Sequence, residues 1–129
     1  MAVRTISAGA THADTLVLGL AGELVKLASG SSVAATGTNQ ATGAALSDCV
    51  TSVTAADGTK AVVLPAASAG RLMVVYNSVA TNGLPIFPAT SGTINGGSAN
   101  AAITIEGKTL AILVGIDSTN WAAVFTANT

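Results

Sequence analysis

Between Arg71 and Glu106 the chain carries no charged side chain, and its apolar residues come in short runs separated by glycine and proline. Apolar runs of about four to eight residues between turn signals are typical of strands, whereas a membrane-spanning helix needs about 20 mostly apolar residues. Pro85, Pro88 and several glycines interrupt this segment. It therefore predicts short strands and turns and excludes a membrane span, so we expect no membrane partner.

Charge is scarce throughout. Charged residues make up 9% of the 129 residues, against about 25% in an ordinary soluble domain. Half of the residues are hydrophobic, which disfavours disorder, because disordered chains are poor in apolar residues and rich in charge. The length suits one domain. This composition indicates that part of the exterior is buried against copies of the chain or a larger partner, and we expect a homo-oligomer.

The residues that could carry chemistry are few. The net charge is −1 with no cluster of Lys and Arg, which argues against a nucleic-acid partner, since such binding rests on clustered basic residues. Cys49 and His12 are the only residues of their kinds, and no metal-ligand spacing or phosphate-binding motif occurs. We expect a protein that is not an enzyme, with no catalytic residue, no metal site and no cofactor.

Residues 15–29, TLVLGLAGELVKLAS, allow two interpretations. As a helix the segment spaces its leucines by three and four residues. As a hairpin it places Leu16, Leu18 and Leu20 on one face, with a turn at Ala21-Gly22. Each of its two glycines would cost a helix about 1 kcal/mol, which favours the hairpin, but both alternatives stay open.

The middle of the chain predicts strands at AVVL (61–64) and RLMVVYN (71–77), the second central or covered because both of its faces are apolar. Asp57-Gly58 is a strong turn signal, because glycine accepts positive φ without strain. Pro85 and Pro88 confine the piece around Ile86 to a sheet edge or a turn, because proline donates no hydrogen bond to a ladder.

The C-terminal third predicts a hairpin that turns at Glu106-Gly107 and pairs Ile103 with Leu110. Its second strand alternates regularly, and its large apolar residues are expected to face the core; they are Leu110, Ile112, Val114 and Ile116. DSTN (117–120) then turns the chain into a last strand with Trp121, Ala123 and Phe125 on one side, and Trp121 and Phe125 are expected in the core.

Short strands at regular spacing indicate an all-β fold, an antiparallel β-sandwich or a jelly-roll-like single domain with an N-terminal arm. We divide the chain into an N-terminal arm with the first hairpin, residues 1–37, and a β-sandwich domain, residues 38–129.

Two long motifs carry a resemblance to a known family. They are VVLPAASAGRLMVVYN (62–77) and IFPATSGTINGGSAN (86–100), followed by an ending at Trp121. Over about residues 38–125 the chain resembles a small β-rich module of tailed-bacteriophage structural proteins. Some members of this family are capsid decoration (cement) proteins, and others belong to fibre or tail proteins. No catalytic residue comes with the resemblance, and residues 1–37 lie outside it.

The resemblance implies a virion protein made in the host cytoplasm and placed on the capsid exterior, where it bridges subunits of the major capsid protein as a trimer. The alternative is a head or tail fibre module for host attachment. The chain offers no room for a long shaft, which favours the decoration protein. Arginine is enriched at interfaces, and the arm would reach a neighbour. The expected interface residues are Val3, Arg4, Ile6, Leu16, Leu18, Leu20 and Arg71.

Overall fold

A computed structural model describes residues 27, 29, 30 and 32–126, and these residues form ten strands and no helix. The strands are β1 (Val33–Ala34), β2 (Ala44–Ala45), β3 (Val50–Thr54), β4 (Val62–Val63), β5 (Leu72–Asn77), β6 (Leu84–Phe87), β7 (Thr93–Ile94), β8 (Ile103–Ile105), β9 (Leu110–Gly115) and β10 (Asn120–Phe125).

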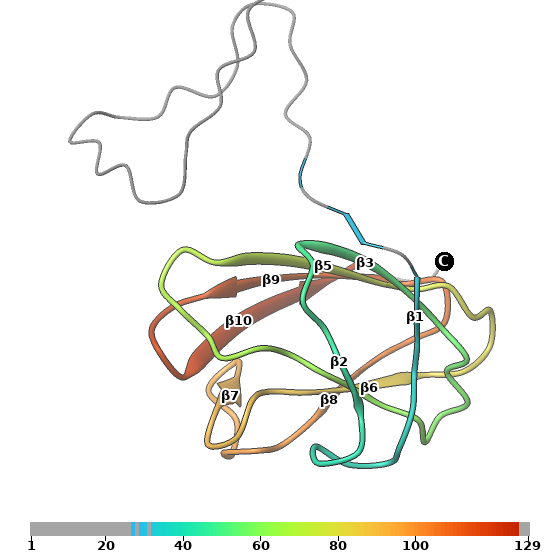
Figure 1. Ribbon diagram of the computed structural model, residues 1–129, viewed down its shortest axis with the longest axis horizontal. Coiled ribbons are helices and arrows are strands. Elements are labelled where there is room, and N and C mark those ends of the chain that lie inside the picture. Colours follow the sequence, from blue (N-terminus) through green and yellow to red (C-terminus); the bar gives the residue numbers. More distant parts are fainter. Residues whose placement is uncertain (1–26, 28, 31, 127–129) are drawn as a thin grey trace, which may run out of the picture.

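The first six strands alternate between two sheets (Figure 1). β1, β3 and β5 stack in parallel in one sheet, and β2, β4 and β6 stack in parallel in the other. Each passage from one sheet to the other and back is one coil. Successive coils lie side by side in register, so that Val50 pairs with Val74 and Val62 pairs with Ile86. The chain thus forms a β-solenoid of stacked coils.

The last strands add antiparallel pairs to this stack. β8 pairs with β6, β9 pairs with β5, and β10 pairs with β9, while the short β7 runs parallel to β10 at the edge. The result is a six-stranded sheet of order β1-β3-β5-β9-β10-β7 and a four-stranded sheet of order β2-β4-β6-β8. In Figure 1, β3, β5 and β9 run along the top of the domain, and β2, β6 and β8 lie below them.

The all-β prediction is confirmed, but the antiparallel sandwich or jelly roll is wrong. In such folds a turn joins neighbouring antiparallel strands. Here the turn at Asp57-Gly58 carries the chain from β3 in one sheet to β4 in the other, and each of the first four strands pairs with the strand two places later. Alternation of apolar residues indicates which side chains point inward, but it is the same for a hairpin and for a coil.

The hairpin predicted around Glu106-Gly107 is wrong for the same reason. Ile103 pairs with Ile86 in the four-stranded sheet, whereas Leu110 pairs with Tyr76 in the six-stranded sheet. Residues 106–109 therefore cross between the sheets. Lys108 makes this crossover possible at a positive φ of 57°; its backbone N–H donates to the carbonyls of Asn77 and Val79, at 3.0 and 2.9 Å.

The prediction that Pro85 and Pro88 confine their segment to an edge or a turn is also wrong, since β6 lies between β4 and β8. Pro85 and Phe87 direct their backbone groups to the same side of the strand. The Phe87 carbonyl accepts a bond from Leu64, so this side faces β4. β4 begins only at Val62, opposite Ile86. Pro85 thus sits where the neighbouring strand has not yet begun and needs no N–H.

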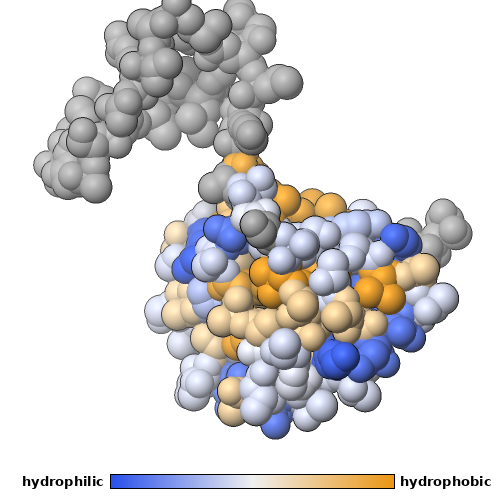
Figure 2. Space-filling model, turned by 45° about the vertical axis from the view of Figure 1, so that its right-hand side comes forward, coloured by the Kyte–Doolittle hydropathy of each residue, from blue (hydrophilic) through white to orange (hydrophobic). Residues whose placement is uncertain are grey.

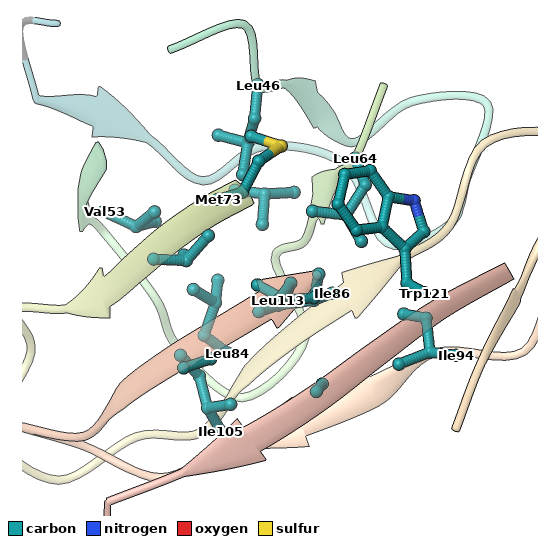
Figure 3. Close-up of a cluster of buried hydrophobic side chains, with 14 of the residues drawn as sticks. Leu46, Val53, Leu64, Met73, Leu84, Ile86, Ile94, Ile105, Leu113 and Trp121 are labelled. Atoms are coloured by element: carbon teal, nitrogen blue, oxygen red, sulfur yellow. The ribbon is translucent and has the colours of Figure 1, made fainter. Parts of the chain in front are cut away.

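The core lies between the two sheets (Figure 3). Its largest fully buried side chain is Trp121, which was predicted in the core, and Leu64, Met73, Leu84 and Leu113 pack in the same cluster. The prediction that Phe125 lies in the core is wrong, since its side chain is 44% exposed at the end of β10. RLMVVYN is confirmed as a central strand, because β5 lies between β3 and β9.

Candidate interaction surface

The outward side of the six-stranded sheet is apolar along β5 and β9 and in part on their neighbours β3 and β10, where Ser52, Thr54 and Asn120 are its polar residues. Side chains alternate between the two sides of a strand, so the residues between the buried ones point away from the core. We call the apolar residues among them the outer face: Val50, Leu72, Val74, Tyr76, Leu110, Ile112, Val114, Ala122 and Val124.

β9 shows the alternation most clearly, and it reverses the orientation predicted from the sequence. The large residues expected in the core point outward: Ile112 is 39% exposed and Val114 is 37% exposed. The smaller Ala111 and Gly115 point inward. A Cβ added to Gly115 would lie 2.0 Å from the carbonyl oxygen of Ser68, so the interior has no room for larger residues at this end of the strand.

Strand pairing arranges the outer face in rows. One row runs from Val50 through Val74 and Ile112 to Val124, because each is the register partner of the next. A second row holds Leu72, Val114 and Ala122. Val124 is 64% exposed. Figure 2 shows hydrophobic residues at the top of the domain and across the middle of this view, and most of the strongly hydrophilic residues around its sides and base. Surface apolar residues are common singly, but a contiguous patch marks an interaction site.

No charged residue lies on the outer face. In the part of the chain that the structure describes, every charged residue lies in a turn or loop: Asp48, Asp57, Lys60, Arg71, Glu106, Lys108 and Asp117. The charged residues of the described part therefore lie in the loops around the sheets and not within a strand.

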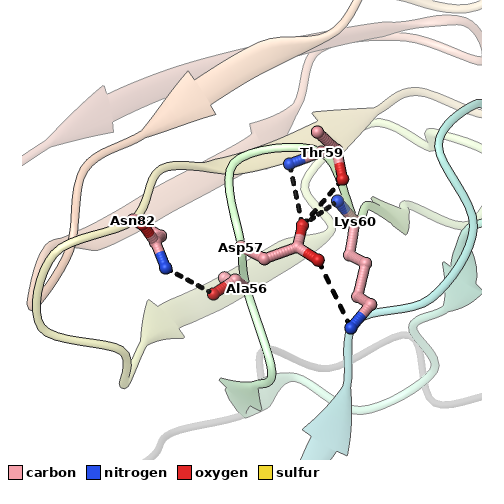
Figure 4. Close-up of polar contacts among 5 residues, drawn as sticks. All are labelled: Ala56, Asp57, Thr59, Lys60 and Asn82. Carbon is pink, nitrogen blue, oxygen red and sulfur yellow. Dashed lines mark hydrogen bonds and ion pairs between the residues drawn. The ribbon is translucent and has the colours of Figure 1, made fainter.

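Two of these acids close turns of the same design. The Asp57 carboxylate accepts bonds from the backbone N–H groups of Lys60 at 2.8 Å and Thr59 at 2.9 Å, and its other oxygen lies 3.3 Å from the Lys60 Nζ (Figure 4). Asp117 accepts equivalent bonds from the N–H groups of Thr119 and Asn120. Bonds to the ionised form lower a carboxyl pKa. The Lys60 and Thr59 N–H groups lower the pKa of Asp57 well below its usual range; the Thr119 N–H, with Asn120, lowers the pKa of Asp117 to about 2.

Asn77, the last residue of the first motif, is fully buried and holds two crossovers together. Its side-chain nitrogen donates to the carbonyls of Asn82 at 2.8 Å and Glu106 at 3.2 Å, and its side-chain oxygen accepts from the Val79 N–H at 3.1 Å. The side chain thus joins the loop after β5 to the crossover between β8 and β9.

Asn95, in the second motif, acts as an extension of β7. Its side-chain nitrogen donates to the Ala123 carbonyl at 3.0 Å, and its side-chain oxygen accepts from the Ala123 N–H at 2.7 Å. This pair of bonds reproduces a backbone ladder with β10. The side chains of Asn77 and Asn95 therefore make their hydrogen bonds to the backbone of the domain itself.

Chemical groups suited to catalysis do not converge within the described residues. Among them, no three of His, Cys, Asp and Glu come close enough to hold a metal ion. No helix in the described part is long and apolar enough to cross a membrane. The Cys49 thiol is half-buried and donates to the Leu72 carbonyl at 3.1 Å. The Trp121 Nε1 is buried without a hydrogen-bond partner among the described residues.

Most of the interface residues predicted from the sequence lie outside the described residues, as does nearly all of the segment 15–29. They are Val3, Arg4, Ile6, Leu16, Leu18 and Leu20. Arg71 is half-buried just before β5, and its guanidinium lies 3.5 Å from the Ala66 carbonyl. Sequence reasoning missed the outer face. A partial signal was present in β9, where the small Ala111 and Gly115 share the inward side with Leu113, and larger apolar residues occupy the whole of the other side.

Comparison with protein-family models, with curated proteins and with solved structures found no match to this chain. The resemblance to phage structural modules therefore rests on the sequence motifs.

Proposed function

We propose that this chain is a structural protein of a bacteriophage particle, which decorates the outside of the capsid and stabilises it by bridging subunits of the major capsid protein. The two long motifs support the phage assignment. The observation that carries the proposal is the outer face, an uncharged apolar surface on a domain whose motif asparagines bind its own backbone. Such a protein works by covering surface rather than by chemistry.

In this proposal the two parts of the chain have different tasks. The arm, with Val3, Arg4 and Ile6, binds the capsid, and the solenoid domain forms the body that stands on it. Many identical copies on one shell make weak contacts effective, because linked binding events raise the overall avidity. A surface with few charges also loses little on desolvation when copies pack closely.

Labelling of intact virions tests the location. Antibody raised against the purified chain should label the heads in electron micrographs, over the whole shell. Label confined to the tail or to a few vertices would favour the alternative, a fibre module for host attachment. Particles that carry no label would refute both locations.

Binding to capsids that lack the protein tests the division of tasks. A variant without residues 1–14 should keep the circular dichroism spectrum and melting temperature of the full chain and should co-sediment with capsids much more weakly. The matched control is Thr104→Lys, a charge placed on the exposed Thr104 of β8, which should bind as the full chain does. Full occupancy by the truncated chain would show that the arm is not the anchor.

A further inference from the structure

We draw no further inference here: the strongest candidate, the outer face on the outward side of β5 and β9, carries none, because nothing in the part of the chain that the structure describes shows what covers it.

Discussion

On β9, Leu113 is fully buried, whereas its neighbour Ile112 has the same number of carbon atoms and is 39% exposed. The two residues represent the two sides of the six-stranded sheet. The inner side packs against the four-stranded sheet, and the outer side packs against nothing in the described chain. The difference teaches that apolar alternation marks the two sides of a sheet, while the elements that pack against each side decide which one becomes the core.

The largest effect is expected where the inner side is bulkiest. Trp121→Ala should lower the free energy of unfolding by about 3–5 kcal/mol, because it removes the largest buried side chain and leaves a cavity between the sheets. Urea unfolding followed by circular dichroism measures this change. Val124→Ala, on the outward side of the same strand, should cost less than about 1 kcal/mol. Similar losses for the two variants would break the distinction between the sides.

A matched pair on β9 gives the sharpest comparison. Leu113→Ala should lower the free energy of unfolding by about 2–5 kcal/mol, because it leaves a cavity between the sheets. Ile112→Ala should lower it by less than about 1 kcal/mol, because this side chain is partly exposed. Urea unfolding of both variants checks the pair. If Ile112→Ala proves as destabilising as Leu113→Ala, the outer face contributes to the monomer's own packing.

The inner side also contains one buried polar residue that holds loops rather than filling space. Asn77→Ala should cost about 1–3 kcal/mol, because the carbonyls of Asn82 and Glu106 lose a buried donor. Hydrogen exchange should rise first in the segments around residues 79–82 and 106–109. Uniform exchange over the whole domain would mean that Asn77 supports the sheets and not the crossovers.

The smallest effect is expected for the turns that Asp57 and Asp117 close, which lie in loops and on neither side of the sheet. A folded-state pKa below the ordinary value means that the ionised carboxylate stabilises the fold. For Asp117, with a pKa lowered to about 2, this contribution is complete above about pH 4 and is lost as the pH falls toward 2. Melting temperatures should therefore decline over that window. Asp117→Asn, which keeps the acceptor and removes the titration, should make the decline shallower; an unchanged slope would exclude Asp117 as its source.

The sequence predicted the strands better than their partners. The runs that contain Val62, Val74 and Trp121 are strands, and Asp57-Gly58 is a turn. The pairing of Ile103 with Leu110 fitted both faces of a hairpin, yet those residues lie in different sheets. A local pattern cannot distinguish these cases, because the crossover depends on contacts distant in sequence.

The candidate surface was less accessible to prediction. The outward position of Ile112 depends on the coils that fill the interior and on the Ser68 backbone over Gly115. The sequence of β9 holds only a partial sign of it, the small Ala111 and Gly115 on the inward side. Arg71, predicted for the interface, lies just before the start of β5 and is not one of the outer-face residues.

The hydrogen bonds between Asn95 and Ala123 also affect how fast the protein is chemically modified over time. Asn95 precedes Gly96, and asparagine before glycine deamidates readily when the following backbone nitrogen can attack the side-chain carbonyl. Here both ends of the amide are held by Ala123, so the reaction must wait for β7 to separate from β10. Conversion to aspartate would replace the donor that faces the Ala123 carbonyl with a negative charge, and the edge would not close again. Slow chemical change at this one position would thus record how often the edge of the sheet has opened during the lifetime of the protein.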